Sequence, residues 1–132
     1  MDKTLCFRPL WLLCGWAMLV VAVWLSLIGA PPQAVGIPHA DKLKHLLAYA
    51  VLMGWFGQIY TARGAQRGWL IGLVLMGIML EFLQGWGGVR FFEYADMLAN
   101  TLGALLGYWL TRGPLAGTLA RVDLQLARKK GT

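Results

Sequence analysis

The chain has 132 residues, of which 58% are hydrophobic and 14% are charged, and its mean hydropathy is +0.59. An ordinary water-soluble domain is much less apolar, so this composition predicts a single-domain integral membrane protein. The formal net charge of +6 does not indicate nucleic-acid binding, because the basic residues lie in short segments between apolar runs rather than along one face.

The apolar runs predict an all-α bundle of about four transmembrane helices. The first run covers Leu10 to Ile28 and is long enough to cross a hydrocarbon core of about 30 Å. A cleaved signal peptide is the alternative, although this run exceeds the roughly 7 to 15 apolar residues of such a segment. The other runs cover residues 43–60, 69–84 and about 96–110. Each is shorter or more polar than an ideal span, but four in succession favour a multi-pass protein.

Small residues within these runs predict where two helices approach closely. Glycines recur at four-residue spacing in Gly68 with Gly72 and in Gly103 with Gly107. Such pairs permit close contact between helices in a membrane. The two cysteines, Cys6 and Cys14, lie too near each other in the chain to staple distant segments, so we assign them no special role.

The basic residues predict that both chain termini face the cytoplasm. Nine of the twelve fall on one side of the predicted membrane, and the positive-inside rule places that side in the cytoplasm. The nine are Lys3, Arg8, Arg63, Arg67, Arg112, Arg121, Arg128, Lys129 and Lys130, and the three opposite are Lys42, Lys44 and Arg90.

Residues 113–132 are predicted to form a basic cytoplasmic tail outside a transmembrane domain that covers residues 1–112. Apolar side chains in this tail recur at helical spacing, while Arg121 and Arg128 lie off that stripe. The stripe consists of Leu115, Leu119, Val122 and Leu126. It predicts an amphipathic helix on the inner leaflet, and a frayed polar tail is the alternative.

Polar residues inside the predicted helices mark the candidate site. An ionisable group in a membrane helix costs several kcal/mol unless it is paired, so each is a candidate functional position. The predicted topology brings these residues to one depth near the outer face. They are Asp41, His45 and Tyr49 of the second helix, Glu81 and Gln84 of the third, Asp96 and Asn100 of the fourth, and the loop residue Arg90. They could form one hydrogen-bonded network, with Arg90 neutralising Glu81 or Asp96.

Three function classes fit such a cluster. It could be an outer-facing pocket for a polar or amphiphilic envelope ligand, the centre of an intramembrane enzyme with His45 or Glu81 as general base, or interhelical glue in a structural or assembly factor. The sequence assigns no catalytic residue and favours a non-enzymatic protein. One histidine with carboxylates is not a diagnostic metal-ligand set, so we expect neither a metal nor another cofactor.

The ordered pattern of these residues resembles the VanZ-like family of small integral membrane proteins. It spans about residues 41–110 and consists of Asp41 to His45 with Tyr49, Glu81 to Gln84, Arg90, and Asp96 to Gly103 with Gly107. Family members often carry a proline just before the arginine, where this chain has Val89.

The resemblance implies a multi-pass protein of the cell inner membrane with a role in the envelope. The family takes its name from a protein linked to low-level resistance to the glycopeptide teicoplanin. The implied partners are membrane lipids, with a lipid-linked cell-wall precursor or a glycopeptide as candidate ligands, and no nucleic acid. The resemblance leaves the substrate and the oligomeric state open.

Overall fold

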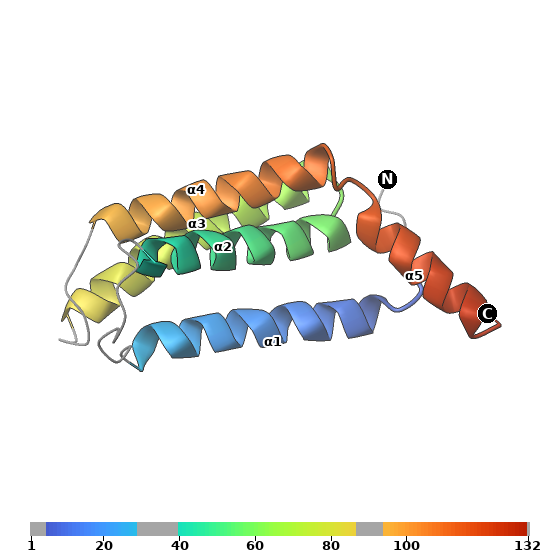
Figure 1. Ribbon diagram of the computed structural model, residues 1–132, viewed down its shortest axis with the longest axis horizontal. Coiled ribbons are helices and arrows are strands. Elements are labelled where there is room, and N and C mark those ends of the chain that lie inside the picture. The colour runs from blue at the N-terminus through green and yellow to red at the C-terminus, as the bar shows by residue number, and fades with distance from the viewer. Residues whose placement is uncertain (1–4, 29–39, 87–93, 132) are drawn as a thin grey trace.

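The computed structural model describes residues 5–28, 40–86 and 94–131, without the side chains of residues 40 and 41. The regular secondary structure of these residues is all helix, with short turns between the helices, which confirms the predicted all-α class. The helices are α1 (Arg8–Leu27), α2 (Ala40–Ile59), α3 (Arg63–Trp86), α4 (Tyr94–Arg112) and α5 (Thr118–Lys129) (Figure 1). Arg90 and the side chain of Asp41 lie outside the described residues.

Each predicted apolar run coincides with one of the first four helices, but α3 begins earlier than its run. It starts at Arg63 rather than at Trp69. Arginine and glutamine are good helix formers, so the helix continues through the charged segment before the apolar residues begin. An apolar run therefore marks the hydrophobic part of a helix and not its end.

The structure supports membrane crossing for two of the four helices. Among the described residues, α1 and α3 are long and apolar enough to span a membrane, judged by length and composition. Helices α2 and α4 do not meet that criterion, because polar residues such as Lys42 and Asp96 occupy their first turns. The bundle of four membrane-spanning helices therefore stays a prediction, with α1 and α3 as its candidate spans.

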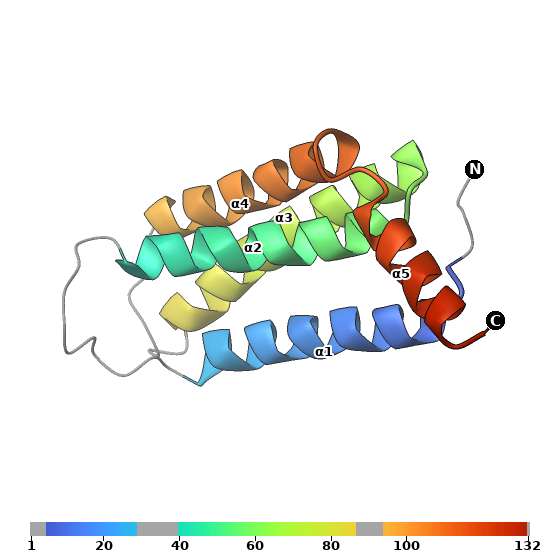
Figure 2. The same cartoon turned by 45° about the vertical axis from the view of Figure 1, so that its right-hand side comes forward.

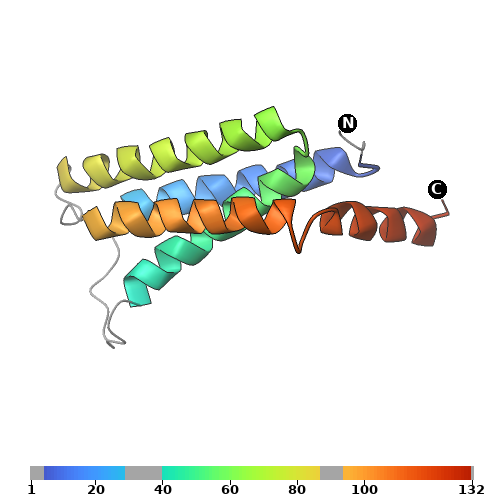
Figure 3. The same cartoon turned by 90° about the horizontal axis from the view of Figure 1, so that it is seen from above.

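Helix α2 is the centre of the bundle and contacts every other helix. Helices α1 to α4 run alternately up and down, with α1 lying against α2 and α3 (Figure 2). We call the end where α2 ends and α3 begins the α5 end, and the opposite end the loop end. Helix α5 extends the molecule past the end of α4 (Figure 3).

Two glycines of α4 form the seam between α2 and α4. A Cβ atom at Gly103 would collide with the backbone carbonyl of Leu46, and one at Gly107 would collide with that of Ala50. The predicted Gly103–Gly107 pair is therefore confirmed as a close helix contact. The Gly68–Gly72 prediction is wrong, because a Cβ at either position would meet no atom within 4 Å.

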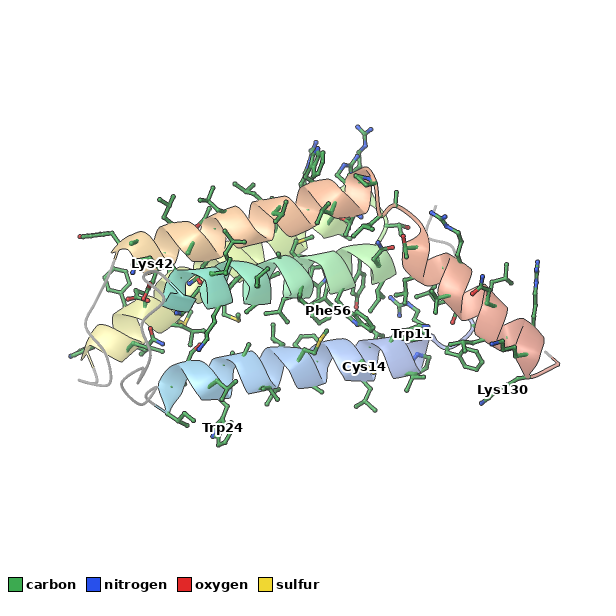
Figure 4. The ribbon with its side chains drawn as sticks, in the orientation of Figure 1. Trp11, Cys14, Trp24, Lys42, Phe56 and Lys130 are labelled. Atoms are coloured by element: carbon green, nitrogen blue, oxygen red, sulfur yellow. The ribbon has the colours of Figure 1, made fainter. Side chains whose placement is uncertain are left out.

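Aromatic side chains join α1, α2 and α3. Phe56 is completely buried and stacks on Trp69 with ring centroids 3.8 Å apart, and Trp16 meets both rings edge-on. Other large apolar side chains face outward, and Trp24 points away from the bundle (Figure 4). An exterior with so many exposed apolar side chains is typical of contact with lipid or with another protein.

The tail is helical, which favours the predicted amphipathic helix over a frayed segment. Leu115, Val122 and Leu126 of the predicted stripe are exposed, as a stripe in contact with a leaflet requires, while Leu119 is buried together with Asp123 and Ala127. The face packed on the protein contains Asp123 because this residue binds the N-terminal segment, as described below. Contact between the exposed leucines and a membrane leaflet stays a prediction.

Candidate functional site

Five of the predicted site residues are buried at the loop end of the bundle. They form what we call the polar cluster, which consists of Tyr49 of α2, Glu81 and Gln84 of α3, and Asp96 and Asn100 of α4. Glu81 and Asp96 are each only 1% exposed. The one-turn spacing within α3 and within α4 places both polar residues of each helix on its inner face. His45 lies four residues before Tyr49 on α2 and is partly buried.

The centre of the cluster is a contact between three helices at Gly77. A Cβ atom built there would lie 3.1 Å from Asn100 Nδ2 and 3.2 Å from Tyr49 Oη. The absence of a side chain on Gly77 thus allows the α2 phenol and the α4 amide to pack against α3. Glu81 lies one turn further along α3 on the same face of that helix as Gly77. At the level of Gly77 the three helices thus meet through polar groups, beside the apolar core formed by Leu52, Met53 and Leu73.

Gln84 points toward α1 and stands apart from that contact. Its Nε2 donates a hydrogen bond of 2.6 Å to the backbone carbonyl of Ser26, near the end of α1. The hydrogen bond joins the last turns of α1 and α3. Gln84 therefore has a visible structural role that its position in the sequence did not specify.

Lys42 is the residue that sequence reasoning missed at this end. Its Nζ lies 3.8 Å from Asp96 Oδ1, and its side chain is 33% exposed. Arg90 was the predicted counter-ion and lies outside the described residues. Lys42 had entered the sequence argument only through membrane orientation and the family pattern. Its place in the first turn of α2, at the depth of Asp96, was the signal that could have identified it.

Beside Lys42 a hollow opens between α2 and α4. It has a volume of about 360 Å³ and is lined, apart from Lys42, by aliphatic side chains that include Leu46, Leu98 and Leu102. Figure 4 places Lys42 where α2 begins. An ammonium group at the rim of an apolar hollow suits a polar group attached to an apolar chain. Within the polar cluster, the buried Asn100 Oδ1 accepts no hydrogen bond from the described residues.

A metal centre has no support in the described part of the chain. Nowhere in it do three His, Cys, Asp or Glu side chains gather as they would around a metal ion. His45, Glu81 and Asp96, a histidine and two carboxylates of the candidate site, are therefore not gathered there as a ligand set.

At the α5 end, Asp123 joins the two ends of the chain. Its carboxylate accepts hydrogen bonds from the backbone N–H groups of Cys6 at 2.6 Å and Phe7 at 2.9 Å, and from Trp11 Nε1 at 2.8 Å. We call this arrangement the Asp123 clamp. Sequence reasoning missed it, and an acidic residue inside an otherwise basic tail was its only signal.

The clamp shifts two ionisation equilibria. Burial by itself would raise the pKa of Asp123, but the hydrogen bonds from Trp11, Cys6 and Phe7 outweigh it and lower the pKa. Desolvation, followed by the negative charge of Asp123, raises the pKa of the Cys6 thiol. Asp123 is therefore held as a carboxylate and Cys6 as a thiol near neutral pH.

Comparison with known proteins assigns the family. The model of the VanZ/LLP1 family matches residues 5–117, which include helices α1 to α4. No curated protein and no solved structure matches the chain. The family match and the two apolar helices α1 and α3 together favour a membrane protein. Because the match covers most of the sequence, this chain belongs to the VanZ/LLP1 family.

Proposed function

We propose that this protein is a multi-pass protein of the cell inner membrane that binds a polar or amphiphilic ligand of the cell envelope at its loop end. The observation that carries the proposal is the polar cluster, in which Glu81 and Asp96 are almost completely buried while Lys42 reaches the rim of an apolar hollow. Buried charges in a membrane helix are costly, so their presence favours a function that needs them.

In this proposal Lys42 donates hydrogen bonds to the polar head of the ligand. Asp96 positions the ammonium group, and the hollow beside Leu46 and Leu98 receives an apolar chain. The separation of 3.8 Å between Lys42 Nζ and Asp96 Oδ1 is longer than a hydrogen bond. A lysine ammonium group carries three N–H donors, so it can bind a ligand oxygen while it stays close to Asp96.

The test of this proposal compares the variant Lys42→Gln with the matched control Lys44→Gln. Lys44 is exposed on the same turn of α2 and does not line the hollow, so both variants remove one positive charge from the same end. Native mass spectrometry of protein extracted in a mild detergent should detect a co-purified lipid or precursor on the wild type and on Lys44→Gln. Loss of that adduct from Lys42→Gln alone is the expected result. Equal adducts on all three proteins would contradict the proposal.

The proposed topology places both termini in the cytoplasm. In support, Arg8, Arg63, Arg67 and Arg112 occur in helix turns at the α5 end, whereas Lys42 and Lys44 lie at the loop end. Reporter fusions at residue 132 and within residues 29–39 provide the test. A periplasmic signal at residue 132 with a cytoplasmic signal in the loop would place the polar cluster at the wrong membrane face.

A structural role for the polar cluster is the second candidate. The bond from Gln84 to the carbonyl of Ser26 and the packing of Tyr49 and Asn100 on Gly77 favour it, because both join helices directly. A structural cluster predicts that any envelope phenotype of its variants, including glycopeptide tolerance, follows their thermal stability. A ligand site predicts loss of phenotype by Lys42→Gln at wild-type stability.

A further inference from the structure

A cavity at the α5 end, which has several polar side chains in its lining, has no part in the function proposed above. It has a volume of about 770 Å³, within the usual range for small-molecule sites. The ends of α2, α3 and α4 form one side and α5 forms another. Two arginines, several amide and hydroxyl groups and the Cys6 thiol line it; the polar residues are Gln58, Thr61, Gln66, Thr111, Arg112, Arg121 and Asp123.

Arg112 is held in a fixed position by a buried glutamine. Its Nη1 donates a 2.9 Å hydrogen bond to Gln66 Oε1, and Gln66 Nε2 donates a 2.8 Å hydrogen bond to the carbonyl of Gly57. Gln66 is 3% exposed, so this support is itself packed inside the protein. The Arg112 guanidinium also lies over the Tyr108 ring at 5.6 Å. These neutral partners orient the arginine without neutralising its charge.

Arg121 approaches the cavity from the first turn of α5. Its Nη2 and Nε donate hydrogen bonds to the backbone carbonyls of Ala116, at 3.1 Å, and Gly117, at 3.4 Å. Gly117 has a φ of 75°, which lets the chain turn from α4 into α5. Within the described residues, neither Arg112 nor Arg121 forms an ion pair. Each guanidinium has more N–H donors than these bonds use.

Asp123 is the carboxylate that lines the cavity among the described residues, and it forms no ion pair with Arg112 or Arg121 there. Asp123 is 3% exposed, and its oxygens already accept the three hydrogen bonds of the clamp. The donors of these bonds are neutral, so Asp123 keeps its negative charge, and the two guanidinium groups leave the lining side chains with a net charge of one positive unit. Guanidinium groups suit phosphate in both charge and geometry, because they can donate two parallel hydrogen bonds to its oxygens.

We propose that this cavity binds the phosphate group of a ligand, with Arg112 and Arg121 as its direct contacts. The phosphate can belong to the headgroup of a membrane phospholipid or to a soluble phosphorylated molecule, and the chemistry of recognition is the same. The site is independent of Lys42 and of the hollow at the loop end.

The test measures binding by the purified full-length protein in detergent. The probes are short-chain phosphatidylglycerol, phosphatidylcholine with the same chains, and inorganic phosphate. We expect phosphatidylglycerol to bind, and Arg121→Gln to weaken its affinity about tenfold or more through loss of charged hydrogen bonds. Arg112→Gln should act similarly. Arg67→Gln is the matched control, because Arg67 is exposed on the first turns of α3 and does not line the cavity.

A second measurement locates the ligand inside the cavity. Cys6 lines it, whereas Cys14 lies on α1 outside it, so a bound probe should slow alkylation of Cys6 by a maleimide and leave Cys14 unaffected. Arginine-dependent binding of inorganic phosphate would support a soluble ligand as the source. Such binding by phosphatidylglycerol alone would support a lipid. Equal affinities of wild type, Arg121→Gln and Arg67→Gln for every probe, without Cys6 protection, would overturn the proposal.

Discussion

The two ends of the bundle hold their polar groups in different ways. At the loop end, Glu81, Asp96 and Asn100 lie inside the bundle, on helices that approach through glycine. At the α5 end, Asp123 binds a segment more than a hundred residues away in the chain, and Gln66 orients an exposed arginine. The loop end is thus organised by neighbouring helices, and the α5 end by the meeting of the two termini.

The two arrangements differ in how much of the fold depends on their charged groups. A buried carboxylate at the loop end is shielded from solvent by three helices, so changes there should affect the whole fold. The Asp123 clamp connects only α5 to the start of α1, so its loss should release a local unit. Variants at each end test whether changes at the loop end lower the stability of the whole fold while changes at the α5 end alter only local order.

Gly103→Ala at the α2–α4 seam should give the largest effect. The added methyl group would meet the backbone of Leu46, which cannot move like a flexible side chain, so we expect a loss of about 3 kcal/mol or more in the free energy of unfolding. Thermal unfolding in detergent provides the measurement.

The matched control for the seam is Gly72→Ala, at an open position of α3. No atom lies within 4 Å of the added Cβ, and alanine favours a helix over glycine by about 1 kcal/mol, so this variant should be as stable as the wild type or more stable. If both alanine variants unfold alike, the seam does not organise the bundle as described.

Asp123→Ala should have a smaller and more local effect. It removes the acceptor of three hydrogen bonds, and we expect a loss of about 2 kcal/mol, reduced where Cys6 can reach water. Hydrogen exchange should accelerate at the amides of Cys6 and Phe7, while the α2–α4 seam stays protected. Gln125→Ala, at an exposed position of α5, is the control. Equal exchange in both variants would show that the clamp does not hold α5.

A still smaller effect should appear as a pH dependence. Because the folded-state pKa of Asp123 is lowered, its stabilising contribution is complete above the ordinary aspartate pKa of about 3.9 and is lost as pH falls through the lowered value. Between about pH 5 and about pH 2, the wild type should lose protection at Phe7 more steeply than Asp123→Asn. Parallel curves of protection against pH for the two proteins would show that Asp123 is not the group that titrates.

Sequence reasoning located the helices and the polar residues at the loop end because both follow from local periodicity. Apolar runs gave the helices, and one-turn spacing placed Glu81 with Gln84 and Asp96 with Asn100 on common faces. It could not choose between glycine pairs, since the spacing of Gly68 and Gly72 is the same as that of Gly103 and Gly107. Only the three-dimensional packing distinguishes an open glycine from one at a seam.

The same reasoning could not find the α5 end, for a physical reason. The Asp123 clamp joins residues at opposite ends of the chain, and no periodicity relates them. The stripe of tail leucines could not indicate which face packs on the protein, because hydrophobicity alone ignores a carboxylate that is satisfied by backbone N–H groups. Lys42 was used only for orientation and the family pattern, so its pairing with Asp96 was also missed.

The smallest expected change in stability is that of a His45 variant. This variant distinguishes a functional site from a purely structural cluster at the loop end. His45 is partly buried, four residues before Tyr49 on α2, and glutamine preserves much of its volume and hydrogen-bonding capacity. We therefore expect His45→Gln to unfold within about 0.5 kcal/mol of the wild type. If the imidazole transfers a proton or changes charge during function, the variant should still fail to rescue the envelope phenotype of a deletion strain. Thermal unfolding of the purified variant and rescue of that phenotype should be measured together. Full rescue at wild-type stability would exclude acid–base chemistry by His45 and leave it a neutral hydrogen-bonding role beside the polar cluster.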